Sequence, residues 1–541
     1  MKDHQKAFEN PSVFTPAILF IVIIVSALGA IIGVQLITSL GISANTSIIG
    51  ALLAMILARI PIKLFYRYKS IHTQNLVQTS ISSATFGAGN SLMIPIGIPF
   101  IFGRTDLIMP MLIGASCALI VDAVILYRVF DSKIFPAEGT WAPGIATSEA
   151  IKAGDQGGKK AKFLGIGIAG GIIGQWLGIP MSAFGVAFIG NIIALTMFGI
   201  GLLFSGYSSS LFGLDINAIY LPQGVMIGAG LVALGQMVTM IIKSKKALAQ
   251  SSKDSETAAA AEVVQSPAKH TRSEKDTTRA FGLGFVAYLI VALIIALMGG
   301  LISHMSIGML IVFLLFAAFA AFCHEIIVGI AAMHSGWFPA FAVALITLII
   351  GMLIGFPPVA LALLVGFSAA TGPAFTDMAY DFKTGYLLRG SGKDIKAELE
   401  GRKQQFKAGL LGFAVAIAVV AFTFHIYFAQ GLVPPVDKVY VSTIKAGVSS
   451  HIALELLLWA IPGAILQLIG GSKRQMGVLF ATGLLLMDPI AGWSVIAGIL
   501  IRVIILKIYG KKAEPAMFTT AAGLIAGGAL YSFFSSVFKL K

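Results

Sequence analysis

The chain has 541 residues, of which 57% are hydrophobic and only 11% are charged. Ordinary soluble domains carry roughly 25% charged residues, so a soluble fold would leave far too much apolar surface in contact with water. The net charge of +14 is divided among short connections between apolar runs and does not form one patch. This distribution argues against a nucleic-acid partner and matches the excess of Lys and Arg in cytoplasmic loops of membrane proteins.

The apolar runs, taken in chain order, predict an all-α, polytopic integral membrane protein with about 14–16 transmembrane segments. A membrane-spanning helix needs about 20 apolar residues, and residues 14–40, 281–302 and 406–428 each reach that length. The first run is too long for a typical signal-peptide core, so we interpret it as a transmembrane helix that follows a cytoplasmic N-terminus. A multi-pass protein of the cytoplasmic membrane is therefore expected, with the lipid bilayer as its surroundings.

Residues 74–91 form a segment that lipid should not contact. They are rich in amides and hydroxyls and are followed by Pro95 and Pro99. Polar groups inside a membrane span are costly and mark functional sites, so we interpret the stretch as a broken helix that lines a hydrated path. Polar packing between helices is the alternative. The candidate substrate-binding residues in this stretch are Asn75, Gln78, Thr79, Ser82, Ser83 and Asn90.

Some of the predicted segments cannot all cross the membrane. Three apolar runs, 164–180, 182–206 and 222–242, lie between two basic clusters that we place on the same side. An odd number of crossings cannot return the chain to that side, so at least one run is re-entrant or broken. The pair 476–488 and 490–508 has the same character, with a turn between its two members.

Residues 244–280 interrupt the apolar pattern and divide the chain in two. They are rich in Ser, Ala, Thr and charged residues, which predicts a disordered cytoplasmic linker. The flanking transmembrane halves, 1–243 and 281–541, are of similar length and each ends in a Gly-rich run. Because transporters are often built from repeated halves, we expect two related halves within one membrane domain. The alternative is that small residues recur in membrane helices because they let backbones pack closely.

The second polar segment, residues 371–386, closes an apolar run and leads into a basic loop. Asp377 and Asp381 are four residues apart and would share one face of a helix. Lys383 could pair with one of these two acids, and Gly385 could end the helix. Asp377 could carry a coupling proton, whereas a charged helix end at the cytoplasmic interface is the alternative. The candidate substrate-binding residues of this segment are Thr371, Thr376, Asp377 and Tyr380.

Single acidic residues inside apolar runs are further candidates for proton coupling. Asp122, Glu325 and Glu455 each lie in such a run. A carboxyl group in apolar surroundings can exist in its protonated form, as proton-coupled transport requires. Equally, a buried basic or amide partner could neutralise each of them. We expect Asp377 to carry the proton, with Glu455 and Glu325 next, and keep Asp122 and Asp381 as candidates.

Several kinds of chemistry leave no trace in the sequence. There is no phosphate-binding loop of the Gly-x-x-x-x-Gly-Lys-Ser/Thr type and no hydrolase or kinase signature. Neither of the two cysteines lies in a metal-ligand spacing, and both lie in apolar runs. We therefore predict no enzymatic activity, no cofactor and no metal site.

Five motifs, in the same order along the chain, resemble those of the oligopeptide-transporter (OPT) superfamily, which includes the yellow-stripe-like metal-chelate transporters. They are Asn75-x-Val77-Gln78-Thr79, the stretch from Pro143 through Glu149 and Lys152 to Gly154, Asp381-Phe-Lys383-Thr384-Gly385-Tyr386, Arg402-Lys403-Gln404-Gln405 and Gly523-Leu-Ile-Ala-Gly527. Residues 476–488 depart from the resemblance, because they lack the Tyr and Pro of the family's Gly-x-Tyr-x-Pro helix. The chain is short beside eukaryotic members, which suggests a prokaryotic protein.

The resemblance implies proton-coupled import of small peptides, peptide derivatives or metal chelates. Alternating access around a site formed by residues 75–99 and 371–385 would supply the mechanism. The alternatives are a passive channel or exporter, a membrane-embedded enzyme built on His324 and Glu325, and a scaffold that transports nothing. The expected partners are a small-molecule substrate, protons, lipid and a second copy of the chain in a homo-oligomer.

Overall fold

The computed structural model describes residues 11–41, 70–155, 159–236, 239, 270–335, 340–447 and 449–539. This part of the chain is helical and contains no β-strand, only an isolated bridge between Phe130 and Phe135. The helices of the first half are α1 (Pro16–Leu40), α3 (Ile71–Phe86), a π-helix (Gly87–Met93), α4 (Ile94–Phe102), α5 (Ile108–Val129), α6 (Ala142–Asp155), α7 (Lys159–Trp176), α8 (Met181–Ile189), α9 (Ile192–Phe212) and Leu221–Gln236. The second half contributes α11 (Glu274–Met298), α12 (Ile307–Ser335), α13 (Ala340–Ile354), α14 (Pro358–Ala370), α15 (Pro373–Leu388), α16 (Ile395–Ala429), α17 (Pro435–Ala446), α18 (Ser450–Arg474), α19 (Met476–Leu486), α20 (Pro489–Tyr509) and α21 (Glu514–Lys539).

Ten helical stretches of the described residues are long and apolar enough to cross a membrane. They begin with Pro16–Leu40 and end with Pro489–Ser532, and three shorter apolar helices accompany them. Many of their large apolar side chains are exposed on the outside of the bundle, as lipid-facing residues are. The prediction of an all-α, multi-span membrane protein is confirmed, while the total of about 14–16 spans stays a prediction.

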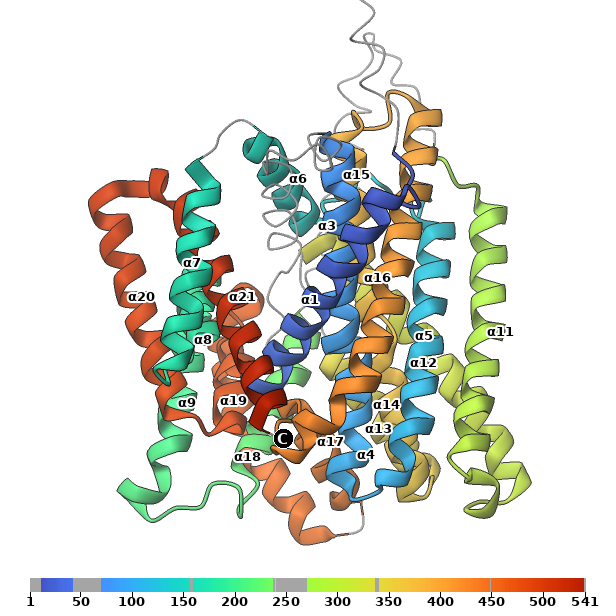
Figure 1. Ribbon diagram of the computed structural model, residues 1–541. Helices are drawn as coiled ribbons and strands as arrows, with labels where there is room; N and C mark the ends of the chain where they lie inside the picture. The colour runs from blue at the N-terminus through green and yellow to red at the C-terminus, as the bar shows by residue number, and fades with distance from the viewer. Residues whose placement is uncertain are drawn as a thin grey trace, which may run out of the picture.

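The helices form two groups with α1 passing between them (Figure 1). In one group α7, α8 and α9 pack against α19, α20 and α21, and in the other α3, α4 and α5 pack against α11, α14, α15 and α16. Helix α1 contacts α3 and α16 on one side and α21 on the other. Each group therefore combines helices from both predicted halves of the chain.

Helix α3 lies at the centre of the second group because glycines let its neighbours approach its backbone. A side chain at Gly33 of α1 would meet the backbone of Thr85, and one at Gly412 of α16 would meet the backbone of Ser80. Small residues at such crossings replace side-chain contact with close backbone packing, which is a main source of helix association in membranes. The polar side chains of α3 are thereby enclosed by protein on two sides.

The structure changes the details of three predictions about where helices break and where the linker ends. Residues 71–102 do not break but stay helical throughout, with the wider π-helical turns at Gly87–Met93. The run 182–206 is interrupted between α8 and α9, where the Asn191 side chain accepts from the first amides of α9. Helix α11 already begins at Glu274, inside the predicted linker, and residues 244–269 of that linker lie outside the described residues.

Candidate functional site

The polar residues of α3 are buried although the helix lies in a membrane protein. Asn75, Gln78, Thr79, Ser82 and Ser83 are each no more than 1% exposed. Their amides and hydroxyls cannot be satisfied by lipid, so they must bond to neighbouring helices or to a solute. Helix α3 contacts α1, α15, α16 and the π-helix, which supply those partners.

Helix α15 faces α3 with its two acidic residues. The Gln78 side-chain amide donates to Asp381 Oδ1 at 2.6 Å, and the Ser82 hydroxyl donates to Asp377 Oδ1 at 2.9 Å. Gln78 and Ser82 are four residues apart on α3, and Asp377 and Asp381 are four residues apart on α15. Each helix therefore has both of its residues on one face. The order of the contacts makes the two helices antiparallel, and it brings the two polar segments of the sequence together.

Within the described part of the chain, the side chain that bonds to Asp377 is neutral. Asp377 is 2% exposed, and its Oδ2 atom has no hydrogen-bond partner among the described residues. Nearby on α3, the Asn75 Oδ1 atom and the Ser83 hydroxyl are also buried without a partner in that part of the chain, as is the Tyr380 hydroxyl of α15. Helices α3 and α15 therefore carry several buried polar atoms that are unsatisfied within the described residues.

Two expectations for the second polar segment are wrong. Lys383 does not pair with Asp377 or Asp381, because its ammonium group donates to the Ala137 carbonyl at 2.8 Å. Helix α15 does not end at Gly385 but continues to Leu388. Gly385 instead allows close packing, since a side chain there would collide with the side chains of Gln405 and Arg389.

The other candidates from the two polar segments have local roles. The hydroxyls of Thr371, Thr376 and Thr384 donate to backbone carbonyls, Ser368 and Ala321 for the first, Pro373 for the second, and Gly144 and Tyr380 for the third. The Asn90 side chain lies in the π-helix and donates to the Phe86 carbonyl at 3.5 Å. These contacts stabilise the two segments without excluding contact with a solute.

The remaining sequence candidates lie elsewhere. Glu149 of α6 is on the surface and bonds to Lys152 at 3.0 Å. Glu455 of α18 is 25% exposed and lies 3.9 Å from His451, away from α3 and α15. Asp122 and Glu325 are both fully buried, on α5 and α12, in a cluster of their own with Tyr288.

Sequence reasoning missed a buried ionic network at one end of the site. Gln405 of α16 donates to the Asp381 carbonyl at 2.8 Å and to Thr79 Oγ1 at 3.1 Å, while it accepts from Arg389. Arg389 and Arg402 both bind Glu398, and all three are no more than 4% exposed. Burial lowers the pKa of the Arg389 guanidinium, an effect that the Glu398 carboxylate opposes.

The sequence places both arginines in a basic connection between apolar runs, where an excess of Lys and Arg predicts a position in the cytoplasm. The structure corrects this expectation, because Glu398 holds both of them inside the protein. The spacing of Glu398 and Arg402, four residues apart on one helix, was the signal available in the sequence.

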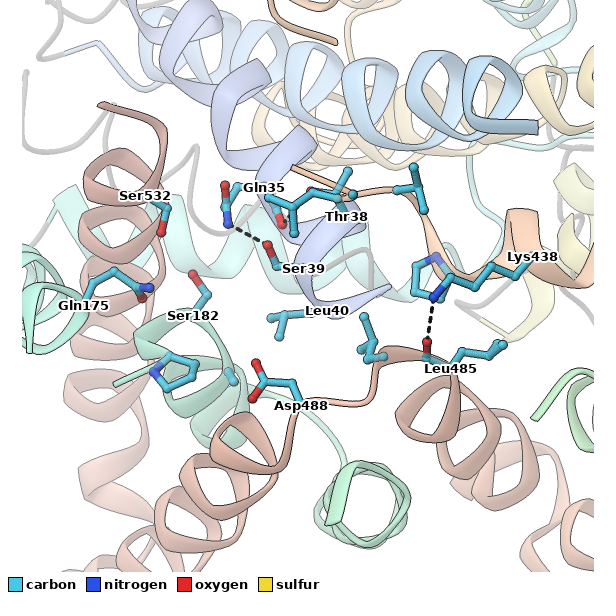
Figure 2. A pocket seen from close by; sticks show the side chains of 17 residues that line it. Gln35, Thr38, Ser39, Leu40, Gln175, Ser182, Lys438, Leu485, Asp488 and Ser532 are labelled. Carbon is cyan, nitrogen blue, oxygen red and sulfur yellow. Dashed lines mark hydrogen bonds between the residues drawn. The ribbon is translucent and has the colours of Figure 1, made fainter. Parts of the chain in front are cut away.

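An open pocket lies at the other end of α1 (Figure 2). Its volume is about 240 Å³, and α1, α8, α17, α21 and the α19–α20 turn contribute to its walls. Gln35, Ser39 and Ser182 line it together with two oppositely charged residues, Lys438 and Asp488. The Lys438 ammonium donates to the Leu485 carbonyl at 3.2 Å, and Asp488 accepts from the Ala491 amide at 2.9 Å, so each charge bonds to the backbone among the residues described.

Sequence reasoning also missed a buried acid on α17. Asp437 is 0% exposed, and neither of its carboxyl oxygens has a hydrogen-bond partner among the described residues. It lies against Gly97 of α4, where any side chain would collide with its carboxyl group. In the sequence it follows two prolines at the start of a short amphipathic helix, a position where an exposed acid is usual.

Comparison with known proteins supplies the family. A family model described as OPT oligopeptide transporter protein matches residues 13–229 and 213–539, which together cover nearly the whole chain. No curated protein and no solved structure matches the chain. Members of this family are membrane transporters and not enzymes, which agrees with a multi-span helical fold and its buried polar centre. The chain therefore belongs to the OPT oligopeptide transporter family.

Proposed function

We propose that this transporter imports small peptides, peptide derivatives or metal chelates together with protons, by alternating access across the cytoplasmic membrane. The observation that carries the proposal is Asp377, a buried acid on a membrane-spanning helix that accepts a hydrogen bond from the neutral Ser82 hydroxyl. A charge at the centre of a bilayer costs roughly 2.5–3.5 kcal/mol or more. An acid without a cationic partner can lower that cost by taking up a proton.

Protonation of Asp377 changes what this side chain can do. The carboxylate only accepts hydrogen bonds, whereas the carboxylic acid also donates one. The Ser82 contact and the unsatisfied Oδ2 atom therefore favour different arrangements in the two states. This difference supplies the free energy that a coupled conformational change needs.

The substrate side of the proposal rests on α3. Asn75 Oδ1 and the Ser83 hydroxyl are buried polar atoms without partners among the described residues. An amide and a hydroxyl together offer donors and acceptors, which matches the alternating N–H and C=O groups of a peptide or the polar edge of a chelate. We assign solute binding to this face of α3, opposite Asp377 and Tyr380 of α15.

The pocket between α1, α8 and α17 is the second part of the proposed route. It lies at the C-terminal end of α1, whereas the N-terminus, which we expect to be cytoplasmic, lies before the other end of this helix. We therefore assign the pocket to the outer side, where an imported solute enters. Lys438 and Asp488 give it one positive and one negative contact.

The proposal is tested by uptake into proteoliposomes of purified protein, with and without an inward proton gradient. Peptides and metal chelates are supplied as separate panels. Gradient-dependent accumulation of one panel is the expected result, and Asp377→Asn should abolish the dependence on the gradient. Asp106→Asn is the matched control, because Asp106 is an exposed acid paired with Arg104.

Three outcomes would each contradict a part of the proposal. Uptake that proceeds equally without a gradient indicates a passive channel, and accumulation only in the opposite direction indicates an exporter. Full gradient-dependent uptake by Asp377→Asn would remove Asp377 from the coupling role.

A further inference from the structure

The start of α15 is held by a side chain from another helix. Thr371 and Gly372 separate α14 from α15, and Gly372 has a φ of +93°, a backbone conformation that favours glycine. Neither α15 nor its N-cap residue supplies a side-chain cap. Instead, Asp122 of α5 accepts from the Gly372 amide through Oδ2 at 2.6 Å.

Asp122 thus occupies the position that an N-cap side chain normally fills. The amide of Phe375 also faces its carboxyl group, and Pro373 between them has no amide hydrogen to offer. A carboxylate is favourable there because the N-terminus of a helix carries partial positive charge and unpaired amides. The other oxygen, Oδ1, accepts from the Tyr288 hydroxyl of α11 at 2.5 Å.

A second acid lies beside this cap. Glu325 of α12 is 0% exposed, faces Asp122 and Tyr288, and has no geometric hydrogen-bond partner for either carboxyl oxygen among the described residues. A further titratable group among the described residues of this region is His324, whose Nδ1 atom is 3.1 Å from Ser368 Oγ and whose ring lies beside Gly372. Two neighbouring carboxyl groups in such a dry site cannot both be charged without a large cost.

We propose that Asp122 and Glu325 form a second proton-binding site, whose occupancy controls the capping of α15. With one proton bound on Glu325, Asp122 stays a carboxylate and accepts from the amides at the start of α15. A second proton, taken from solvent and bound on Asp122, removes the negative charge from the helix N-terminus and weakens the cap. Release of that proton to solvent restores the cap, so the only species exchanged is the proton.

The cap is close enough to the proposed transport site to influence it. Gly372 and Asp377 are five residues apart in sequence, which corresponds to roughly 7.5 Å along a helix. Loss of the cap would let the start of α15 move relative to α3, and the Ser82–Asp377 contact would move with it. The inference rests on the proposed function, since it assigns a regulatory proton to the helix that carries Asp377.

Infrared spectroscopy of the purified protein tests the proton directly and needs no substrate. Wild type should show the C=O band of a protonated, buried carboxyl group at neutral pH. Glu325→Gln should remove the component of this band that comes from Glu325, whereas Asp377→Asn should leave that component in place. An unchanged spectrum in Glu325→Gln would overturn the assignment of a proton to Glu325, whatever the uptake assays show about Asp377.

Two substitutions at Asp122 separate capping from proton binding. Asn keeps an oxygen that can accept from the Gly372 amide but cannot be protonated, whereas Ala removes both functions. We expect Asp122→Asn to transport with a flattened pH profile, and Asp122→Ala to lose about fivefold or more of its activity at every pH. A wild-type pH profile in folded Asp122→Asn would overturn the proposal.

The proposed function and this inference can fail separately. If Asp377→Asn keeps gradient-driven uptake while Asp122→Asn flattens the pH profile, Asp377 is not the coupling acid but the second proton site stands. If Asp377→Asn abolishes coupling and neither Asp122→Asn nor Glu325→Gln changes the pH profile or the infrared band, only the second site is overturned.

Discussion

The Ser82 hydroxyl donates to Oδ1 of Asp377 at 2.9 Å, across the interface of two helices that are almost 300 residues apart in sequence. One turn away, Gln78 makes the matching contact to Asp381. These two bonds join the two polar segments of the chain, and they lie where we propose that the proton and the solute bind.

Removal of the Ser82 hydroxyl should impair coupled transport more than folding. Ser82→Ala removes the hydroxyl that donates to Asp377 Oδ1, and an unsatisfied buried group costs about 1–3 kcal/mol. We expect a clear loss of gradient-driven uptake in proteoliposomes. Ser116→Ala is the control, because Ser116 of α5 bonds only locally to the Leu112 carbonyl. Equal effects of the two substitutions would argue against a special role for the Ser82 contact.

The arginine network should be essential for stability. Glu398→Gln removes the negative charge between Arg389 and Arg402, and loss of one partner of a buried ionic group costs about 3–5 kcal/mol. We expect a large fall in the unfolding temperature of the purified protein. Glu400→Gln, two residues along the same helix, should change little, because Glu400 is about half exposed and lies 3.8 Å from Lys403.

The two opposite charges of the pocket should bind the two charged ends of a peptide. We expect Lys438→Gln to weaken binding of a peptide with free termini by roughly 1.5–3 kcal/mol, because a charged hydrogen bond to its carboxylate is lost. Asp488→Asn should do the same for the terminal ammonium group. Asn can still cap α20, so this substitution removes the charge with little structural change. Thermal-shift titration of the purified protein measures both effects.

Chemically blocked peptides provide the control for this assignment. A peptide with an amidated C-terminus already lacks the partner of Lys438, so Lys438→Gln should not weaken its binding further. An acetylated N-terminus should likewise make Asp488→Asn silent. Additive losses in either combination would show that these residues do not contact the termini.

The close approach of α3 and α16 should not tolerate a side chain. Gly412→Val places atoms against the Ser80 backbone, and overpacking of this kind costs about 1–3 kcal/mol. We expect a lower unfolding temperature together with reduced transport. Gly282→Ala of α11 is the matched control, since nothing lies within 4 Å of the added atom. A Gly412→Val protein as stable as Gly282→Ala would contradict the packing described here.

Much of the architecture was predictable because it follows from local composition. The apolar run at 14–40 predicted α1, and the turn between residues 476–488 and 490–508 appears between α19 and α20. Five motifs in order predicted the family, which the family match confirms. The detailed backbone was less predictable, because the polar run after Ile71 keeps its helix through π-helical turns where a break was expected.

By itself, the sequence determined that the chain is a helical membrane protein and which residues are too polar for lipid. Both properties depend on composition within about 20 consecutive residues, the length of a helix that crosses a bilayer. Only the tertiary structure decided the partners. It placed Lys383 on the Ala137 carbonyl, buried Arg389 with Glu398, and brought Asp122 to the start of α15. These contacts join distant segments whose packing depends on side-chain shape and close helix crossings, which no local pattern in the sequence encodes.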